Sequence, residues 1–140
     1  MIRAGLAIPP RLRPLPPLDP GAVAAVVAAQ GTASFFPALR DLVQSRAPID
    51  NMVAVVFAAD RGPLTLFQWS PQEPNHFALL YSKGAYRLDP YHLRSLEPRS
   101  MGLHRLRDVA PDDFRTSDFW RTYYQKVGGA TTTIAALLRG

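Results

Sequence analysis

Apolar positions near the start of the chain follow a helical period. Asp19 and Pro20 combine an N-cap with a proline at the first helical position, so a helix is expected over residues 19–30. Gly31 follows as a left-handed C-cap. A second helix is expected over 32–45, with these residues on one face: Phe35, Leu39, Leu42 and Val43.

Two runs rich in β-branched and apolar residues follow, at 52–58 and 64–69. The segment between them, 60–63, reads Asp-Arg-Gly-Pro and has the composition of a turn. This pattern predicts a β-hairpin.

The second half of the chain alternates short helical and strand patterns. Gly84 ends an expected helix over 72–83, and Asp89 caps a short helix that starts at Pro90 and ends before Pro98. The remaining elements are a strand over 103–109, a helical turn over 111–114, a helix over 117–126 and a strand over 131–138. This order predicts an α+β fold with helices packed on a mainly antiparallel sheet.

Composition divides the chain into an arm and one domain. Residues 1–18 hold five prolines and three arginines, which predicts a flexible arm without helix or interior strand. Residues 19–140 are expected to form a single domain, since a chain of 140 residues buries roughly 70% of its extended-chain surface on folding.

Charge and cysteine usage narrow the class of protein. The net charge is +5, but the most basic stretch, 83–107, interleaves six basic residues with Asp89 and Glu97. A solvated surface explains this stretch better than a nucleic-acid face. Zero cysteines exclude disulfides and cysteine chemistry, and no apolar run reaches the ~18 residues of a membrane helix. A cytoplasmic location is expected.

Asp89 is the main candidate for a functional contact. A carboxylate among aromatic side chains can accept a hydrogen bond from a ligand amide or amine in a dry pocket. An aspartate before proline is also a common helix cap, and its two oxygens allow both roles. Ordinary core packing explains most of the aromatic residues. The expected ligand-binding residues are Asp89, Tyr86, Tyr81, Trp69, Trp120 and Tyr91.

Enzyme chemistry has no specific support in the chain. The three histidines are sixteen and twelve residues apart, which matches no compact metal motif. Gly128 and Gly129 lack the lysine of a phosphate loop, and no nucleophile stands beside a base. We therefore expect no catalytic residues, no metal and no cofactor.

Three segments of the chain read Gly84-x-Tyr-x-Leu-Asp-Pro-Tyr91, Leu106-x-Asp-Val-Ala-Pro-Asp-x-Phe114 and Ser117-x-Phe-Trp-x-x-Tyr-Tyr124. In this order they resemble the N-terminal sensor region of LuxR-type transcriptional regulators. The resemblance implies a GAF/PAS-like α/β/α sandwich that senses a small molecule and dimerises. In acyl-homoserine-lactone receptors the aspartate of an Asp-Pro pair bonds the ligand amide, a role that falls on Asp89.

The chain departs from this family in two places. Where those receptors have a tryptophan and a tyrosine upstream of the aspartate, this chain offers His76 and Leu80, with Tyr81 one place out of step. This departure disfavours an acyl-lactone ligand. The chain also ends without the family's helix-turn-helix, so it is expected to be either a sensor fragment or a truncated relative.

The leading hypothesis is a quorum-sensing-like, small-molecule-sensing regulatory domain that controls transcription through ligand binding and dimerisation. Its expected partners are an unidentified small ligand and a second copy or a related regulator, with no specific DNA binding by this chain alone and no membrane. The alternative is an interaction module that pairs with full-length regulators. A small α/β enzyme without cysteine is a third, weaker possibility.

Overall fold

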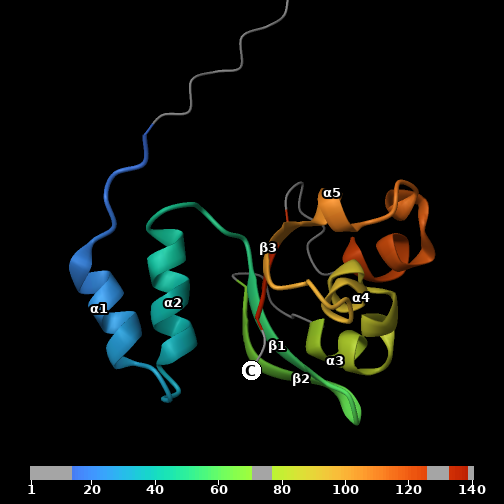
Figure 1. The fold of residues 1–140 in the computed structure, drawn as a ribbon, viewed down its shortest axis with the longest axis horizontal. Coiled ribbons are helices and arrows are strands. Elements are labelled where there is room, and N and C mark those ends of the chain that lie inside the picture. Colours follow the sequence, from blue (N-terminus) through green and yellow to red (C-terminus); the bar gives the residue numbers. More distant parts are fainter. Residues whose placement is uncertain (1–13, 71–76, 126–132, 139–140) are drawn as a thin grey trace, which may run out of the picture. The chain divides into compact units, whose positions relative to one another are not determined.

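The computed structural model describes residues 14–70, 77–125 and 133–138, without the side chains of Phe77, Ala78 and Thr122 (Figure 1). It divides into two compact units, Met1–Pro48 and Ile49–Gly140. Most of the predicted arm lies outside the described residues. The single domain predicted over 19–140 stays a prediction. In the described part of the chain, every helix is too short or too polar to cross a membrane.

The first unit contains two helices, as predicted. Helix α1, Pro20–Ala28, is capped by Asp19, whose carboxylate accepts the N–H of Ala22 at 2.8 Å. Gly31 has a φ of 74°, the left-handed conformation expected of the glycine after a helix. Helix α2, Phe35–Gln44, starts three residues later than predicted. The reason is a turn at Thr32, whose hydroxyl donates to the Ala29 carbonyl at 2.7 Å.

The predicted hairpin is confirmed. Strands β1, Met52–Ala58, and β2, Arg61–Trp69, pair antiparallel. Strand β2 begins earlier than predicted, so Pro63 lies inside it. The register shifts between Val56 and Ala58, opposite this proline. Because proline has no N–H to donate, an irregular point in a two-stranded sheet accommodates it.

The rest of the second unit consists of short helical segments and a second antiparallel pair. In chain order these are α3 Phe77–Ser82, η1 Ala85–Leu88, α4 Pro90–Ser95, β3 Gly102–Arg105, α5 Leu106–Val109, η2 Phe114–Thr116, η3 Trp120–Tyr124 and β4 Ile134–Leu137. Strand β3 pairs antiparallel with β4. Residues 72–76, 126 and 131–132 of the predicted elements lie outside the described part. The α+β class, with short antiparallel sheets flanked by helices, is confirmed, and the GAF/PAS-like sandwich stays a prediction.

The strand predicted over 103–109 is only half right. It stops at Arg105, and Leu106–Val109 form a helical turn in which the Ala110 N–H bonds the Leu106 carbonyl at 2.8 Å. Leu106, Val109 and Ala110 are all half-buried. Their spacing of three and four residues puts all three on one face of a helix. In a strand, Leu106 and Val109 would lie on opposite faces.

Two helical segments near residue 117 also differ from their predictions in detail. The turn predicted at 111–114 is present, with the Phe114 N–H bonded to the Pro111 carbonyl at 3.0 Å, and it continues into the 3₁₀ segment Phe114–Thr116. The Ser117 hydroxyl accepts the N–H of Trp120 at 3.2 Å, which confirms a helix start there. This helix is wound as a π-helix, in which the Gln125 N–H bonds the Trp120 carbonyl at 2.9 Å.

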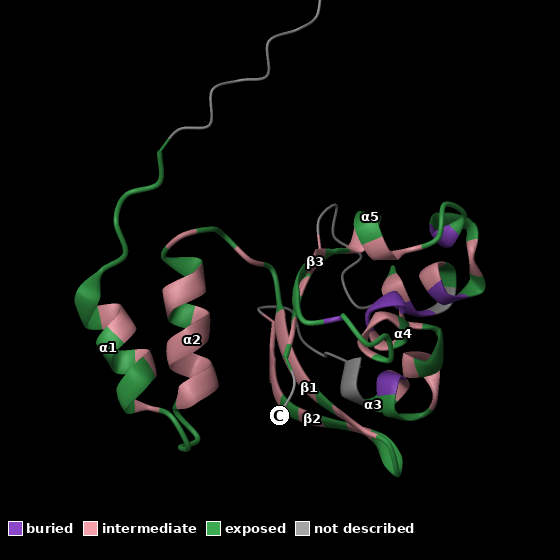
Figure 2. Cartoon of the chain, in the orientation of Figure 1, coloured by how far each residue is buried: buried purple, intermediate pink, exposed green. Residues whose placement is uncertain are grey.

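The core of the second unit is aromatic. Its buried cluster consists of Tyr81, Phe114, Phe119 and Tyr123. Figure 2 shows buried residues on α3 and α4 and on the segments after α5. Phe119 and Tyr123 stack at 4.9 Å between ring centroids, and Phe114 meets Trp120 edge-on at 5.6 Å. Core packing is therefore the role of most aromatic residues singled out in the sequence.

Candidate functional site

Asp89 connects the aromatic core to helix α4. Its backbone is extended, with φ −71° and ψ 121°, which suits the N-cap of a helix that begins with proline. Its Oδ1 accepts the N–H of Tyr91 at 2.9 Å, and its Oδ2 accepts the hydroxyl proton of Tyr81. The predicted cap is confirmed, and the second oxygen is already hydrogen-bonded to the core.

The environment of Asp89 opposes its ionisation. Burial raises the pKa of Asp89 above its ordinary value of 3.8, while the Tyr81 hydroxyl, the Tyr91 N–H and His92 act in the opposite direction. Burial and the nearby Asp89 also raise the pKa of Tyr81. Tyr81 therefore stays protonated at neutral pH and remains a donor to the carboxylate.

The predicted site residues lie at different distances from Asp89. Tyr81 and Tyr91 bond to it directly, and the buried Tyr91 hydroxyl also donates to the Thr133 carbonyl at 2.8 Å. Tyr86 is one step away, with its ring 6.2 Å from that of Tyr81. The structure thus gathers three of the predicted tyrosines around the carboxylate.

The two tryptophans are placed differently. Trp120 packs against the same core and stacks on Tyr124 at 5.1 Å between ring centroids. Trp69 is the last residue of β2 and lies opposite Met52 in the hairpin. The role of both residues in ligand binding stays a prediction.

His92 belongs to this site although the sequence analysis tested histidines only as metal ligands. Its ring lies 4.7 Å from that of Phe57 and 5.1 Å from that of Tyr86. Burial lowers the pKa of His92, and the nearby Asp89 opposes this shift. Within the described residues its buried Nδ1 has no hydrogen-bond partner. The sequence signal for His92 was its position three residues after Asp89, in the helix that Asp89 caps.

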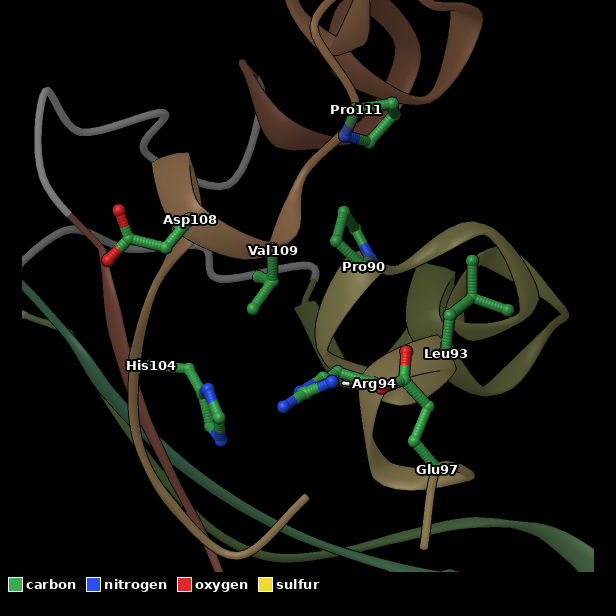
Figure 3. A pocket seen from close by; sticks show the side chains of 8 residues that line it. All are labelled: Pro90, Leu93, Arg94, Glu97, His104, Asp108, Val109 and Pro111. Atoms are coloured by element: carbon green, nitrogen blue, oxygen red, sulfur yellow. Dashed lines mark hydrogen bonds and ion pairs between the residues drawn. The ribbon is translucent and has the colours of Figure 1, made fainter. Parts of the chain in front are cut away.

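Two hollows open on the second unit. The larger, of about 330 Å³, lies between α4, β3 and α5 and is lined by Pro90, Leu93, Arg94, Glu97, His104, Asp108, Val109 and Pro111 (Figure 3). The smaller, of about 210 Å³, is lined by residues of the hairpin turn together with Tyr86, His92 and Leu96. Asp89 lines neither of these two hollows, so the predicted cavity beside it stays a prediction.

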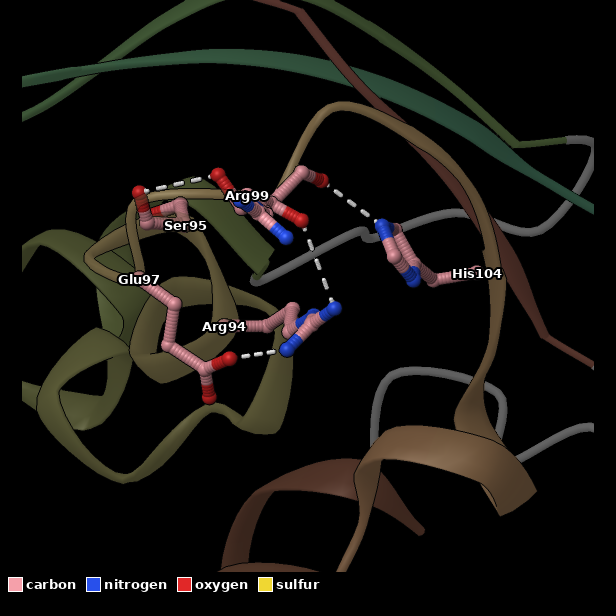
Figure 4. A network of polar contacts seen from close by, with 6 residues as sticks. Arg94, Ser95, Glu97, Arg99 and His104 are labelled. Carbon is pink, nitrogen blue, oxygen red and sulfur yellow. Dashed lines mark hydrogen bonds and ion pairs between the residues drawn. The ribbon is translucent and has the colours of Figure 1, made fainter.

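A polar network borders the larger hollow (Figure 4). The guanidinium of Arg94 pairs with Glu97 and makes a long contact of 3.4 Å with the Arg99 carbonyl. His104 Nε2 lies 2.7 Å from the carbonyl oxygen of the buried Ser100. The sequence analysis did not single out Arg94, and it tested His104 only as a metal ligand. The α4 wall of the hollow could have been predicted from the helical spacing of Pro90, Leu93, Arg94 and Glu97.

Metal binding has no geometric support in the part of the chain that the structure describes. Within residues 14–70, 77–125 and 133–138, no group of three or more histidine, aspartate or glutamate side chains is placed to hold an ion.

The chain matches no family model and no curated protein sequence. Its structure is similar to the crystal structure of the VqsR LBD domain from Pseudomonas aeruginosa, with a TM-score of 0.70 and 27% sequence identity. The similarity covers 86% of this chain and 72% of that chain. VqsR is a LuxR-type regulator, and an LBD is a ligand-binding domain. The comparison supports a regulatory sensor domain and gives no support to an enzyme.

Proposed function

We propose that this chain is a small-molecule-sensing regulatory domain of the LuxR type. The observation that carries the proposal is the structural likeness to a regulator's ligand-binding domain across 86% of the chain. The motifs around Asp89, Phe114 and Trp120 support the same family. A GAF/PAS-like arrangement, a quorum-sensing-like role, a cytoplasmic location and control of transcription through ligand binding and dimerisation complete this proposal.

We assign ligand orientation to Asp89 and the tyrosines around it. A ligand N–H would compete with the Tyr81 hydroxyl for Oδ2, while Oδ1 continues to cap α4. Because Tyr81 is only 2% exposed and belongs to the core, a change in its hydroxyl contact alters core packing. Such coupling is what a sensor needs to transmit binding.

A metabolite panel tests this assignment. A ligand at 100 times its dissociation constant stabilises the fold by ~2.7 kcal/mol, which thermal unfolding detects. Asp89→Asn removes the charge but keeps the shape, and it is expected to weaken binding roughly tenfold to a hundredfold. Asp19→Asn is the matched control, since Asp19 is an exposed Asp-Pro cap on α1. Equal losses in both variants, or no loss in Asp89→Asn, would contradict the role of Asp89.

An interaction module remains the second candidate function because β3 and β4 carry an exposed apolar face. Leu103 is 78% exposed and Ile134 is 59% exposed, and the antiparallel register places both on the same face as Arg105 and Ala136. Exposed apolar residues on a short sheet favour association with a second copy or a related regulator.

Replacement of Leu103 and Ile134 by threonine is expected to weaken self-association at least about tenfold, since two exposed apolar side chains leave the interface. Threonine preserves strand propensity. Sedimentation velocity over a micromolar concentration series measures the effect, with Leu88→Thr, an exposed leucine on η1, as the control. A monomeric wild-type chain throughout the series would refute homodimerisation.

A further inference from the structure

The larger hollow between α4, β3 and α5 has features of a binding site of its own. Figure 3 shows the Arg94 side chain extending into it toward His104, with Val109 above them. Its volume of about 330 Å³ lies at the lower end of the range for small-molecule pockets. Neither Tyr81 nor Tyr91, the partners of Asp89, lines it.

Arg94 is incompletely hydrogen-bonded. A guanidinium has five N–H donors. Nη1 bonds Glu97, Nη2 makes only the 3.4 Å contact with the Arg99 carbonyl, and the buried Nε has no partner among the described residues. The side chain is 32% exposed, so its terminal nitrogens, Nη1 and Nη2, can reach a ligand in the hollow.

His104 supplies the opposite wall. The Ser100 carbonyl can only accept, so His104 Nε2 carries a proton and donates to it at 2.7 Å. This bond fixes the orientation of the His104 ring at the edge of the hollow.

The segment that forms the hollow is positively charged. Residues 90–111 contain four arginines against two carboxylates, Glu97 and Asp108. Asp108 is held by Arg105 at 2.7 Å, and Glu97 is paired with Arg94, so both carboxylates are already compensated. An anion that reaches Arg94 therefore meets no unpaired carboxylate among the lining residues. Leu93, Val109 and two prolines provide apolar walls.

We propose that this hollow binds a small carboxylate with a compact apolar body. Its carboxylate accepts hydrogen bonds from Arg94, and its body lies against Leu93, Val109 and the ring of His104.

Titration calorimetry of the full chain with sodium benzoate and with benzamide tests the proposal, because the two probes share a body and differ in charge. Benzoate is expected to bind saturably and at least about tenfold tighter than benzamide. Arg94→Gln should lose at least about tenfold in benzoate affinity. Arg121→Gln breaks an exposed i,i+3 ion pair with Asp118 and is the matched control.

Glu97→Gln keeps the test valid if Arg94→Gln fails to fold, because its expected effect is a gain in affinity. It removes the protein carboxylate that competes for the guanidinium, so benzoate should bind more tightly. Absence of saturable benzoate binding, equal binding of benzamide, or an equal loss in Arg121→Gln would overturn the proposal. Arg94→Gln tests the site in the hollow, and Asp89→Asn tests the proposed ligand contact at Asp89. Either proposal can therefore fail while the other holds.

Discussion

Truncation of Phe114 to alanine lowers the free energy of unfolding by about 3–5 kcal/mol. Phe114 is only 6% exposed, and its ring meets those of Phe119, Trp120 and Tyr124 within 6.0 Å. Removing the ring leaves a cavity that three large neighbours cannot fill without leaving their own contacts. With a net stability of only about 5–15 kcal/mol for a typical domain, this loss approaches global unfolding.

Urea unfolding followed by tryptophan fluorescence measures this effect, since Trp120 lies against Phe114. Leu96→Ala is the control, because Leu96 is 68% exposed and its truncation should change the free energy by less than about 0.5 kcal/mol. A loss below about 1 kcal/mol in Phe114→Ala would show that the aromatic cluster is not the core of this unit.

Replacement of Tyr81 by phenylalanine is expected to cost about 1–3 kcal/mol at neutral pH, because Asp89 Oδ2 then loses its donor inside the core. This cost depends on pH in a defined direction. The Tyr81 hydroxyl lowers the pKa of Asp89, so its contribution is present when the folded carboxylate is ionised and is lost as the pH falls through the folded pKa of Asp89, which lies above 3.8.

The net shift of Asp89 has the opposite sign. Because burial raises its pKa overall, the unfolded chain ionises first as the pH rises above 3.8, and stability falls until the folded carboxyl has ionised. Tyr81→Phe should make this fall larger and extend it to higher pH, and Asp89→Asn should remove it. Urea unfolding at a series of pH values measures both slopes, with Tyr86→Phe as the control on a half-buried neighbour. Parallel profiles for wild type and both variants would contradict this account of Asp89.

Burial of a carboxylate costs stability. A functional role therefore explains Asp89 better than a contribution to folding does. A core of apolar residues of similar volume would be at least as stable as one built around Asp89 and Tyr81. In a sensor, however, a carboxylate with a single side-chain donor can exchange that donor for a ligand group. The stability measurements and the ligand panel therefore both test the contact between Tyr81 and Asp89.

The helix caps, the hairpin and the family motifs could be predicted from the sequence alone. Asp19 and Asp89 each stand before a proline and cap a helix, because a cap is formed with backbone groups only a few residues away. The hairpin was predicted for the same reason, since its two strands lie on either side of one short turn. The family motifs also pointed to the sensor class that the structural comparison supports.

Only the tertiary structure decided which residues meet over longer separations. Tyr81 reaches Asp89 because Gly84, with a φ of 126°, turns the chain between α3 and η1. Arg94 and His104 border one hollow because β3 returns beside α4. The helical turn at 106–109 is set by burial of Leu106 and by its bond to the Thr133 carbonyl at 2.9 Å. The sequence alone determined the caps, the hairpin and the motifs, which depend on near neighbours. The contacts around Asp89 and Arg94 depend on packing between distant segments, which no local pattern records.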